Sequence, residues 1–214
     1  MNVLIVFVKY PTPGKVKTRL GAEIGVELSA RLYRLFMKKT FDLAGQAGAD
    51  LVLVAFEPAE SADAFDDLIP AEFGRFPQRG SDLGERLEHA FRTAFRRGAG
   101  RVVIIGSDSP TLPPEFVRSA FQGLMESDVV VGPSADGGYY LIGLTTLHAG
   151  LFQGIEWSSP SVLASTLRRA AELGLQAKLL SEWYDVDDLR TLRQAAADDR
   201  TGEISRLLRD GGVK

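Results

Sequence analysis

The sequence contains no cysteine and only two histidines, His89 and His148, in 214 residues. The lack of cysteine excludes disulfide bonds, thiolate metal sites and a cysteine nucleophile. Two isolated imidazoles argue against a histidine-rich metal centre. Any catalytic chemistry must therefore be sought in other residue types.

Long hydrophobic runs are also lacking, because no apolar stretch approaches the ~20 residues of a membrane span. The apolar run at the N-terminus is too short for a signal peptide and ends abruptly in Lys9, Tyr10 and Pro11. The net charge is only −3, so bulk attraction to nucleic acid is not indicated. We expect a cytoplasmic enzyme with no nucleic-acid partner and no membrane span, and keep a homodimer as a hypothesis.

A hydrophobic content of 45% and a charged content of 25% are typical of a soluble globular protein, and we expect one domain over residues 1–214. Apolar patterns predict strands and helices in alternation, as in an α/β domain with a parallel or mixed sheet flanked by helices. Strands are predicted at residues 3–8, 51–56, 101–105, 129–131, 139–144 and 177–180. Helices are predicted at residues 23–44, 63–68, 83–97, 114–125, 160–173, 188–197 and 203–208. Residues 57–80 have poor periodicity.

The loop after the first strand reads KYPTPGKVKTRL and carries four cations, Lys9, Lys15, Lys17 and Arg19. Ligands bind at the carboxyl ends of strands in open α/β sheets. A following helix N-terminus would add backbone N–H donors. The pattern predicts an anion site for the phosphates of a nucleotide; the alternative is a solvated basic loop.

Acidic residues follow two other strands. Asp108 lies in GSDSP at the end of the strand at 101–105, on the same side of the sheet as the basic loop. Asp185 and Asp187, in YDVDD, point the same way along an extended segment, while Asp188 is the better cap for the last helix. Magnesium takes one or two carboxylates together with substrate phosphates, so Asp108 with Asp187 or Asp185 forms a candidate site for Mg²⁺ or Mn²⁺. The alternatives are that Asp108 only forms a turn and that Asp185 or Asp187 only caps a helix.

The segment GPSADGGYY at residues 132–140 joins two predicted strands. Gly137 and Gly138 would let the backbone approach a ligand, Asp136 could accept bonds from hydroxyls, and Tyr139 could stack on a ring. These four residues are candidate substrate contacts. A hairpin turn that needs glycine would explain the same pattern.

A further segment, QRGSDLGER at residues 78–86, begins a predicted helix. Ser81 or Asp82 suits the N-cap, and Glu85 completes a capping-box pattern. Gln78 and Arg79 precede that helix at the edge of the sheet, where their side chains could contact a nucleotide base or phosphate. The residues nominated for the nucleotide site are Lys9, Pro13, Gly14, Lys15, Lys17, Arg19, Gln78, Gly80, Ser107 and Asp108.

These ordered motifs resemble a bacterial glycosyltransferase family with the nucleotide-diphospho-sugar transferase fold, over most of the chain. The basic loop also resembles the Ala-Lys-Thr-Arg-Leu segment of phospholactate guanylyltransferases. The pair Asp108 and Asp187 resembles the metal carboxylates of sugar nucleotidyltransferases. The resemblance implies a Rossmann-like mixed sheet, a nucleotide over the first loop and a divalent metal.

Two departures bear on the reaction. Many glycosyltransferases of this fold use Asp-x-Asp, whereas only Asp108 stands in GSDSP. Sugar nucleotidyltransferases begin with a Gly-rich loop. In this sequence prolines replace most of those glycines, and only Gly14 and Gly21 remain.

Three functional hypotheses follow. The first is a metal-dependent glycosyltransferase that uses a nucleotide-diphosphate sugar, with Asp136, Lys17 and Arg19 as catalytic residues. The second is a nucleotidyltransferase that joins a nucleoside triphosphate to a phosphorylated acceptor and releases pyrophosphate. The third is a nucleotide-binding regulatory protein without turnover.

Overall fold

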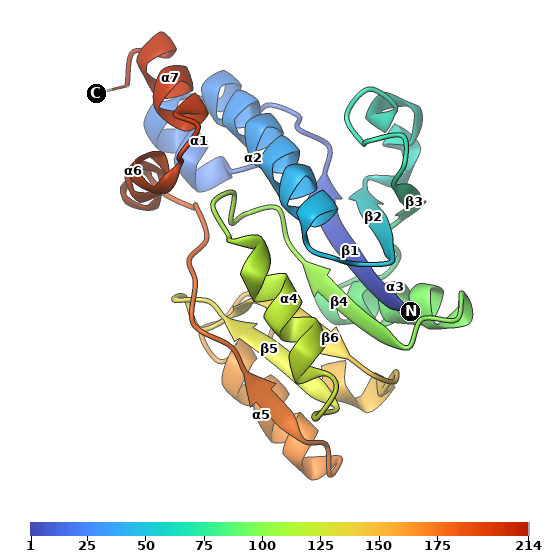
Figure 1. Ribbon diagram of the computed structural model, residues 1–214. Helices are drawn as coiled ribbons and strands as arrows, with labels where there is room; N and C mark the ends of the chain where they lie inside the picture. Colours follow the sequence, from blue (N-terminus) through green and yellow to red (C-terminus); the bar gives the residue numbers. More distant parts are fainter. Residues whose placement is uncertain (214) are drawn as a thin grey trace.

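The computed structural model describes residues 1–213, which are built around one seven-stranded sheet (Figure 1). The strands are β1 (Asn2–Lys9), β2 (Leu51–Glu57), β3 (Gly74–Pro77), β4 (Arg101–Ile105), β5 (Val129–Pro133), β6 (Tyr139–Leu144) and β7 (Ala177–Leu179). The α-helices are α1 (Thr18–Ile24), α2 (Val26–Gln46), α3 (Leu83–Arg96), α4 (Pro114–Gly123), α5 (Val162–Glu172), α6 (Leu189–Asp198) and α7 (Glu203–Asp210). Short 3-10 helices span Ala59–Ser61, Asp63–Phe65 and Ala149–Phe152.

The sheet is mixed, with the strand order β3-β2-β1-β4-β6-β5-β7. β1 pairs in parallel with β2 and β4, and β5 pairs in parallel with β7. β6 runs antiparallel to both of its neighbours. Every strand except β6 therefore ends at the same edge of the sheet, and the loops that follow β1, β4, β5 and β7 meet there.

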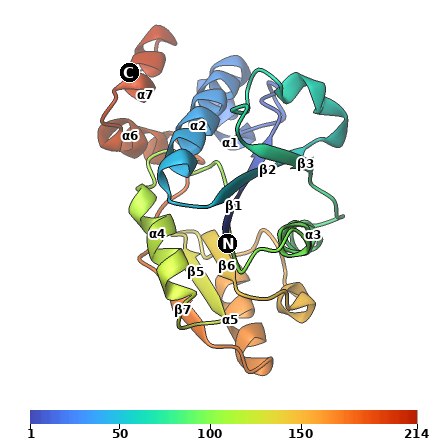
Figure 2. The same cartoon turned by 45° about the vertical axis from the view of Figure 1, so that its right-hand side comes forward.

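Helices cover both faces of the sheet (Figure 2). Alternate residues of β1 point to opposite sides: Leu4 packs in the core with α2, α4, α6 and α7, while Ile5 packs in the core with α3 and α5. This alternation is what the two-residue period of a strand requires. The prediction of an α/β mixed sheet flanked by helices is confirmed. None of the helices among residues 1–213 has the length and apolar character of a membrane span.

The predicted helix at 23–44 is wrong at its start, because helix begins at Thr18 and is interrupted at Gly25. Gly25 has φ 91°, a conformation that favours glycine, and it separates α1 from α2. The interruption lets the chain turn between the two helices, so that α1 follows the basic loop directly.

The region with poor periodicity contains the edge strand β3, which was not predicted. Its four residues include a glycine and a proline, so it offers no recognisable alternation. The helix expected at 63–68 is reduced to the 3-10 turn Asp63–Phe65. The other predicted elements are confirmed, with boundaries that shift by a few residues.

Candidate functional site

Backbone hydrogen bonds bring the predicted acidic segments together at the carboxyl edge of the sheet. The chain beyond β7 first follows β5, where the Trp183 amide donates to the Pro133 carbonyl (3.0 Å). It then crosses to the loop after β4, where the Val186 amide donates to the Asp108 carbonyl (2.9 Å). Val186 itself is fully buried. Its burial orients the aspartates on either side of it toward the site edge, as the sequence predicts.

Lys17 joins the basic loop to both acidic segments. Its Nζ lies 2.6 Å from Asp108 Oδ1 and 3.1 Å from Asp187 Oδ1. The Lys17 side chain is only 5% exposed, whereas those of Asp108 and Asp187 are 49% and 46% exposed. Burial alone would lower the pKa of Lys17, but the two carboxylates outweigh it and raise that pKa, so the ammonium stays charged.

The backbone of Lys17 is in the left-handed region, at φ 45° and ψ 48°, immediately before α1. Residues other than glycine rarely adopt this conformation, and it carries a free-energy cost that tertiary contacts must offset. The buried ion pairs of Lys17 supply such contacts. The strained backbone and the buried ammonium thus occur in the same residue, at the centre of the predicted phosphate site.

Asp185 lies beside this pair in a different environment. Its Oδ1 accepts a hydrogen bond from Ser109 Oγ (2.5 Å) and its Oδ2 accepts one from Ser134 Oγ (3.0 Å). Burial raises the pKa of Asp185 to about 6, although the two serine hydroxyls act in the opposite direction. Asp185 therefore fastens the loops after β4 and β5 to the segment after β7, while Asp187 faces Lys17.

Asp188 caps α6, as the sequence predicts. Its Oδ1 accepts from the Thr191 backbone N–H at 2.7 Å, and Thr191 Oγ1 accepts from the amides of Asp188 (3.2 Å) and Asp187 (3.1 Å). This capping box fixes the start of the helix. Because Asp187 directly precedes the cap, the box also fixes the carboxylate that meets Lys17.

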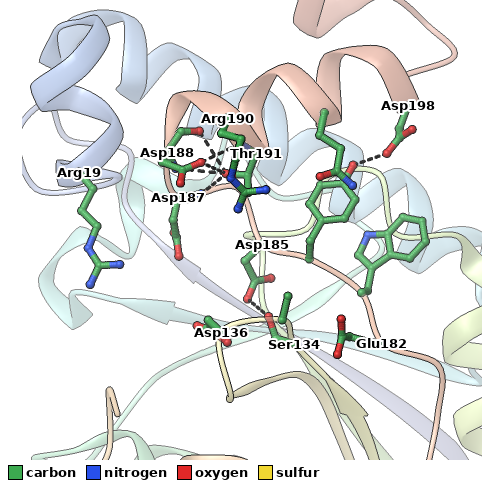
Figure 3. Close-up of a pocket in the computed structure, with 14 residues that line it drawn as sticks. Arg19, Ser134, Asp136, Glu182, Asp185, Asp187, Asp188, Arg190, Thr191 and Asp198 are labelled. Atoms are coloured by element: carbon green, nitrogen blue, oxygen red, sulfur yellow. Dashed lines mark hydrogen bonds between the residues drawn. The ribbon is translucent and has the colours of Figure 1, made fainter. Parts of the chain in front are cut away.

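A cleft of about 590 Å³ opens next to these carboxylates (Figure 3). Arg19 reaches it from α1, Arg190 from α6, and Asp136 from the turn between β5 and β6. The remaining lining residues are Ser134, Ala135, Glu182, Trp183, Tyr184, Asp185, Asp187, Asp188, Thr191, Gln194 and Asp198. The cleft thus continues from the Lys17 cluster toward the β5–β6 turn and α6.

The turn at 134–138 is a tight hairpin connection, which is the alternative that its glycines indicated. The Gly138 amide donates to Asp136 Oδ1 (3.0 Å), and Gly137 has φ 89° with its Cα packed against the Pro160 carbonyl, where a Cβ would come within 2.2 Å. Asp136 nonetheless remains exposed at the cleft. The glycines shape the turn that presents Asp136.

Tyr139 does not face the cleft, contrary to its prediction as a substrate contact. Its hydroxyl is buried, and the ring packs against the core beneath α3 and α5. Tyr140 points to the opposite core and donates from its hydroxyl to the Ser181 carbonyl (2.9 Å). Both tyrosines belong to β6, whose alternation sends them into the two cores. The aromatic side chains at the cleft are those of Trp183 and Tyr184 instead.

Ser107 is also buried inside the protein. Its Oγ lies 2.8 Å from the hydroxyl of Tyr33 on α2. The same hydroxyl accepts a bond from the Lys9 amide at 2.9 Å. Burial, with a contribution from Asp108, raises the pKa of Tyr33 to about 12. Tyr33 therefore links the ends of β1 and β4, a role that its place in a helical apolar pattern did not reveal.

The other nucleotide candidates lie around the ends of β1 and β3. Lys9, Pro13, Gly14 and Lys15 are exposed or partly exposed in the basic loop, and Gly14 has φ 75°. The side-chain amide of Gln78 donates to the carbonyls of Val8 (3.2 Å) and Ala55 (2.9 Å), so its N–H groups hold the strand ends together.

Gly80 has φ 144° and packs against the first turn of α3, where a Cβ would lie 2.5 Å from the Glu85 Cβ. Asp82 is the N-cap of that helix, and the Glu85 side chain accepts from the Ser81 amide (2.7 Å). The capping interpretation of this segment is therefore confirmed.

Residues that the sequence did not nominate complete the cleft: Arg190 and Gln194 on α6, and Glu182, Trp183, Tyr184 and Asp198. Tyr184 Oη donates to Asp198 Oδ2 (2.6 Å) and lies 2.9 Å from Thr111 Oγ1. Tyr184 stands in YDVDD, and Arg190 and Gln194 follow one turn apart on the next helix. Helical spacing from that motif is a signal that could have found them.

Among residues 1–213, no three or more histidine, cysteine or acidic side chains form a cluster that would hold a metal by themselves. The arrangement offers instead two half-exposed carboxylates that converge on one cation. Such a donor set matches Mg²⁺, which binds one or two carboxylates and completes its shell with substrate phosphates and water.

Comparisons with known proteins bear on the family and the fold. A curated relative, phosphoenolpyruvate guanylyltransferase from Chloroflexus aggregans, is 26% identical over 192 residues, or 86% of this chain and 92% of the relative. A crystal structure from Desulfovibrio desulfuricans G20, provisionally named a nucleotide-diphospho-sugar transferase, has a TM-score of 0.91 and 35% identity and covers 99% of this chain and 95% of that one.

A manganese complex of Rv0371c from Mycobacterium tuberculosis H37Rv has a TM-score of 0.56 at 16% identity, covering 91% of this chain and 97% of that one, and it supports the fold alone. A family model described as "Uncharacterized protein conserved in bacteria (DUF2064)" matches residues 40–159. The chain therefore belongs to this bacterial family, DUF2064, and has the nucleotide-diphospho-sugar transferase fold.

Proposed function

We propose that this protein is a nucleotidyltransferase that joins a nucleoside triphosphate to a phosphorylated acceptor and releases pyrophosphate. The observation that carries the proposal is the buried Lys17 ammonium, held between Asp108 and Asp187 at the sheet edge beside an open cleft. The guanylyltransferase relative, which aligns along 86% of the chain, supports nucleotidyl transfer over sugar transfer.

In this reaction an oxygen of the acceptor phosphate attacks the α-phosphorus of the triphosphate. The bond between that phosphorus and the oxygen leading to the β-phosphate breaks, and pyrophosphate leaves with the bonding electrons. Catalysis then depends on positioning the two phosphates and on offsetting the negative charge of the transition state. Lys17 at the end of the basic loop and Arg19 two residues further, at the cleft, would offset that charge.

Asp108 and Asp187 would hold a divalent cation, Mg²⁺ or Mn²⁺. The fit is supported by the Lys17 ammonium, a cation that contacts an oxygen of each carboxylate. When bound there, the metal ion would supply positive charge to the phosphate oxygens. Asp185 is already bonded to Ser109 and Ser134, so we assign it the positioning of these loops.

The cleft between the β5–β6 turn and α6 would receive the acceptor. Arg19 and Arg190 bring two guanidinium groups to it, and guanidinium binds phosphate in a bidentate manner. Asp136, exposed on the turn, would accept a hydrogen bond from a hydroxyl of the acceptor or of the ribose. The exposed basic loop, with Lys9, Lys15, Pro13 and Gly14, would lie along the triphosphate.

Glycosyl transfer from a nucleotide-diphosphate sugar is the second candidate. The provisional name of the Desulfovibrio relative favours it, and a cleft lined by Asp136 could also accept a sugar. The two reactions break different bonds in the nucleotide. They are therefore distinguished by their products.

The proposal is tested by incubating the protein with each nucleoside triphosphate, Mg²⁺ and phosphoenolpyruvate, the acceptor that the relative's name indicates. We expect pyrophosphate that depends on both substrates, and little or none from Asp108→Asn. A panel of small phosphorylated acceptors extends the assay. Nucleoside triphosphates that neither bind in calorimetry nor yield pyrophosphate with any acceptor would refute the proposal.

A further inference from the structure

The contacts of Lys17 with two carboxylates bear on how a metal ion could bind. Its ammonium lies 2.6 Å from Asp108 and 3.1 Å from Asp187, the two carboxylates proposed to hold the metal. Neither carboxylate has another cationic partner among the contacts of the described chain. The ammonium thus offsets one of the two negative charges from within the protein.

Lys17 and the two carboxylates differ in their exposure to solvent. The Lys17 side chain is 5% exposed, whereas each carboxylate is nearly half exposed. Lys17 approaches from the protein side, and the carboxylates remain open to solvent. A cation or a phosphate arriving from solvent therefore reaches this cluster without unfolding any element.

A divalent cation and the ammonium cannot both use the same carboxylate oxygens at full strength. Mg²⁺ requires oxygen ligands at about 2.0–2.1 Å, and like charges at such separations repel strongly in a partly buried site. Lys17 would have to withdraw from at least one carboxylate before the metal could bind. Phosphate oxygens are a suitable new partner because an ammonium binds them as a point charge.

We infer that Lys17 is a built-in competitor of the metal: its ammonium occupies the metal position until nucleotide phosphates draw it away. The order of binding follows, with nucleotide either preceding the metal or arriving with it. The inference rests on the proposed function in two respects: the metal site on Asp108 and Asp187, and the polyphosphate that draws Lys17 away. Its consequence for the nucleotide-free protein can be measured without any reaction.

The test measures Mn²⁺ binding to the nucleotide-free protein by electron paramagnetic resonance, in which bound Mn²⁺ loses the signal of the free ion. We expect Lys17→Met to bind Mn²⁺ about tenfold or more tightly than the wild type, because a competing charge is removed. The same substitution should weaken binding of a nucleoside triphosphate. Removing this one cation should thus strengthen the binding of Mn²⁺ and weaken the binding of the nucleotide.

Lys15→Met is the matched control, since Lys15 is an exposed cation of the same loop and its loss changes the net charge equally. Its Mn²⁺ affinity without nucleotide should stay close to the wild-type value. Adding Asp108→Asn to Lys17→Met should abolish the gain, which places the ion on Asp108. A comparable gain from Lys15→Met would overturn the inference in favour of general electrostatics.

Lys17→Gln provides a second variant, because its amide can still donate to both carboxylates if Lys17→Met fails to fold. Folded variants that bind Mn²⁺ no more tightly than the wild type would overturn the inference. A wild-type protein that binds Mn²⁺ without nucleotide as tightly as Lys17→Gln would do so as well. If nucleotidyl transfer is the wrong reaction, the pyrophosphate assay fails while the shift in Mn²⁺ affinity persists.

Discussion

Replacing Lys39 with methionine should loosen the C-terminal helices that present Asp187. Lys39 projects from α2, and its Nζ contacts Asp199 Oδ1 (2.8 Å), Thr201 Oγ1 (2.7 Å) and Glu203 Oε2 (3.0 Å). Asp199 and Thr201 lie in the connection between α6 and α7, and Glu203 is the first residue of α7. One buried ammonium thus fastens the connection between the two helices to the body of the protein.

The magnitude follows from burial. The side chains of Lys39 and Asp199 are 9% and 4% exposed, and removing one partner of a buried ion pair costs about 3–5 kcal/mol. Asp199 keeps hydrogen bonds from the Ile204 amide (2.9 Å) and from Thr201, so we expect the lower end, about 3 kcal/mol of unfolding free energy. The same change should weaken the contact between Asp187 and Lys17, because Asp187 lies only two residues before the start of α6.

The loss should depend on pH. Burial alone would raise the pKa of Asp199, but hydrogen bonds from Ile204, Lys39 and Thr201 lower it to about 2. A carboxyl with a depressed pKa in the folded state stabilises above its unfolded pKa of about 3.9, and this contribution disappears as pH falls toward 2. The cost of Lys39→Met should therefore be largest at neutral pH and shrink by about 1 kcal/mol between pH 4 and pH 2.

Urea unfolding at pH 7 and at pH 2.5, followed by circular dichroism, measures both effects. Lys38→Met is the control, because Lys38 precedes Lys39 on α2 and contacts the same Glu203 (2.8 Å) but is 60% exposed. An exposed pair is worth at most about 1 kcal/mol. Equal losses from the two substitutions, or a loss independent of pH, would refute the reasoning.

Three further outcomes can be checked on the site. Arg19→Ala should weaken a nucleoside triphosphate far more than the nucleoside in calorimetry, since charge-assisted bonds to phosphate are lost; equal losses would assign Arg19 to folding. Asp136→Ala should raise KM for the acceptor and leave nucleotide affinity within a few-fold; loss of nucleotide binding would contradict its place in the cleft. Gly137→Ala should lower the free energy of unfolding by about 3 kcal/mol or more, because φ is 89° and the new Cβ would meet the Pro160 carbonyl. Gly154→Ala, with φ 69° and open space around the new Cβ, should lower it by about 1 kcal/mol. Similar costs for the two glycines, measured by urea unfolding, would show that the close packing at Gly137 is unimportant.

Much of this fold could be predicted from the sequence because most strands are continuous apolar runs bounded by turns. The strand at 101–105 and the strand at 139–144 were predicted with the bounds that the structure has. The short strand Gly74–Pro77 was missed because edge pairing to β2, a tertiary contact, defines it. The break at Gly25 was missed because one glycine in an apolar helical pattern is usually tolerated.

The candidate site was predicted in part. Lys17, Asp108 and Asp187 meet as the strand-end argument requires, since that argument depends only on parallel strands ending at one edge. It could not tell which aspartate faces Lys17, because residues 185 and 187 point the same way in an extended segment. Tyr139 was misplaced because a glycine-rich turn leaves the alternation of the next strand undetermined.

The central claim is that nucleotidyl transfer occurs, and one competition experiment tests it most directly. Wild-type protein, Mg²⁺, a nucleoside triphosphate, a phosphorylated acceptor and the matching nucleotide sugar are incubated together, and the products are identified by ³¹P NMR and mass spectrometry. The account predicts pyrophosphate and a new phosphoanhydride between nucleotide and acceptor, with the nucleotide sugar unchanged. Release of nucleoside diphosphate from the nucleotide sugar, without pyrophosphate, would contradict it.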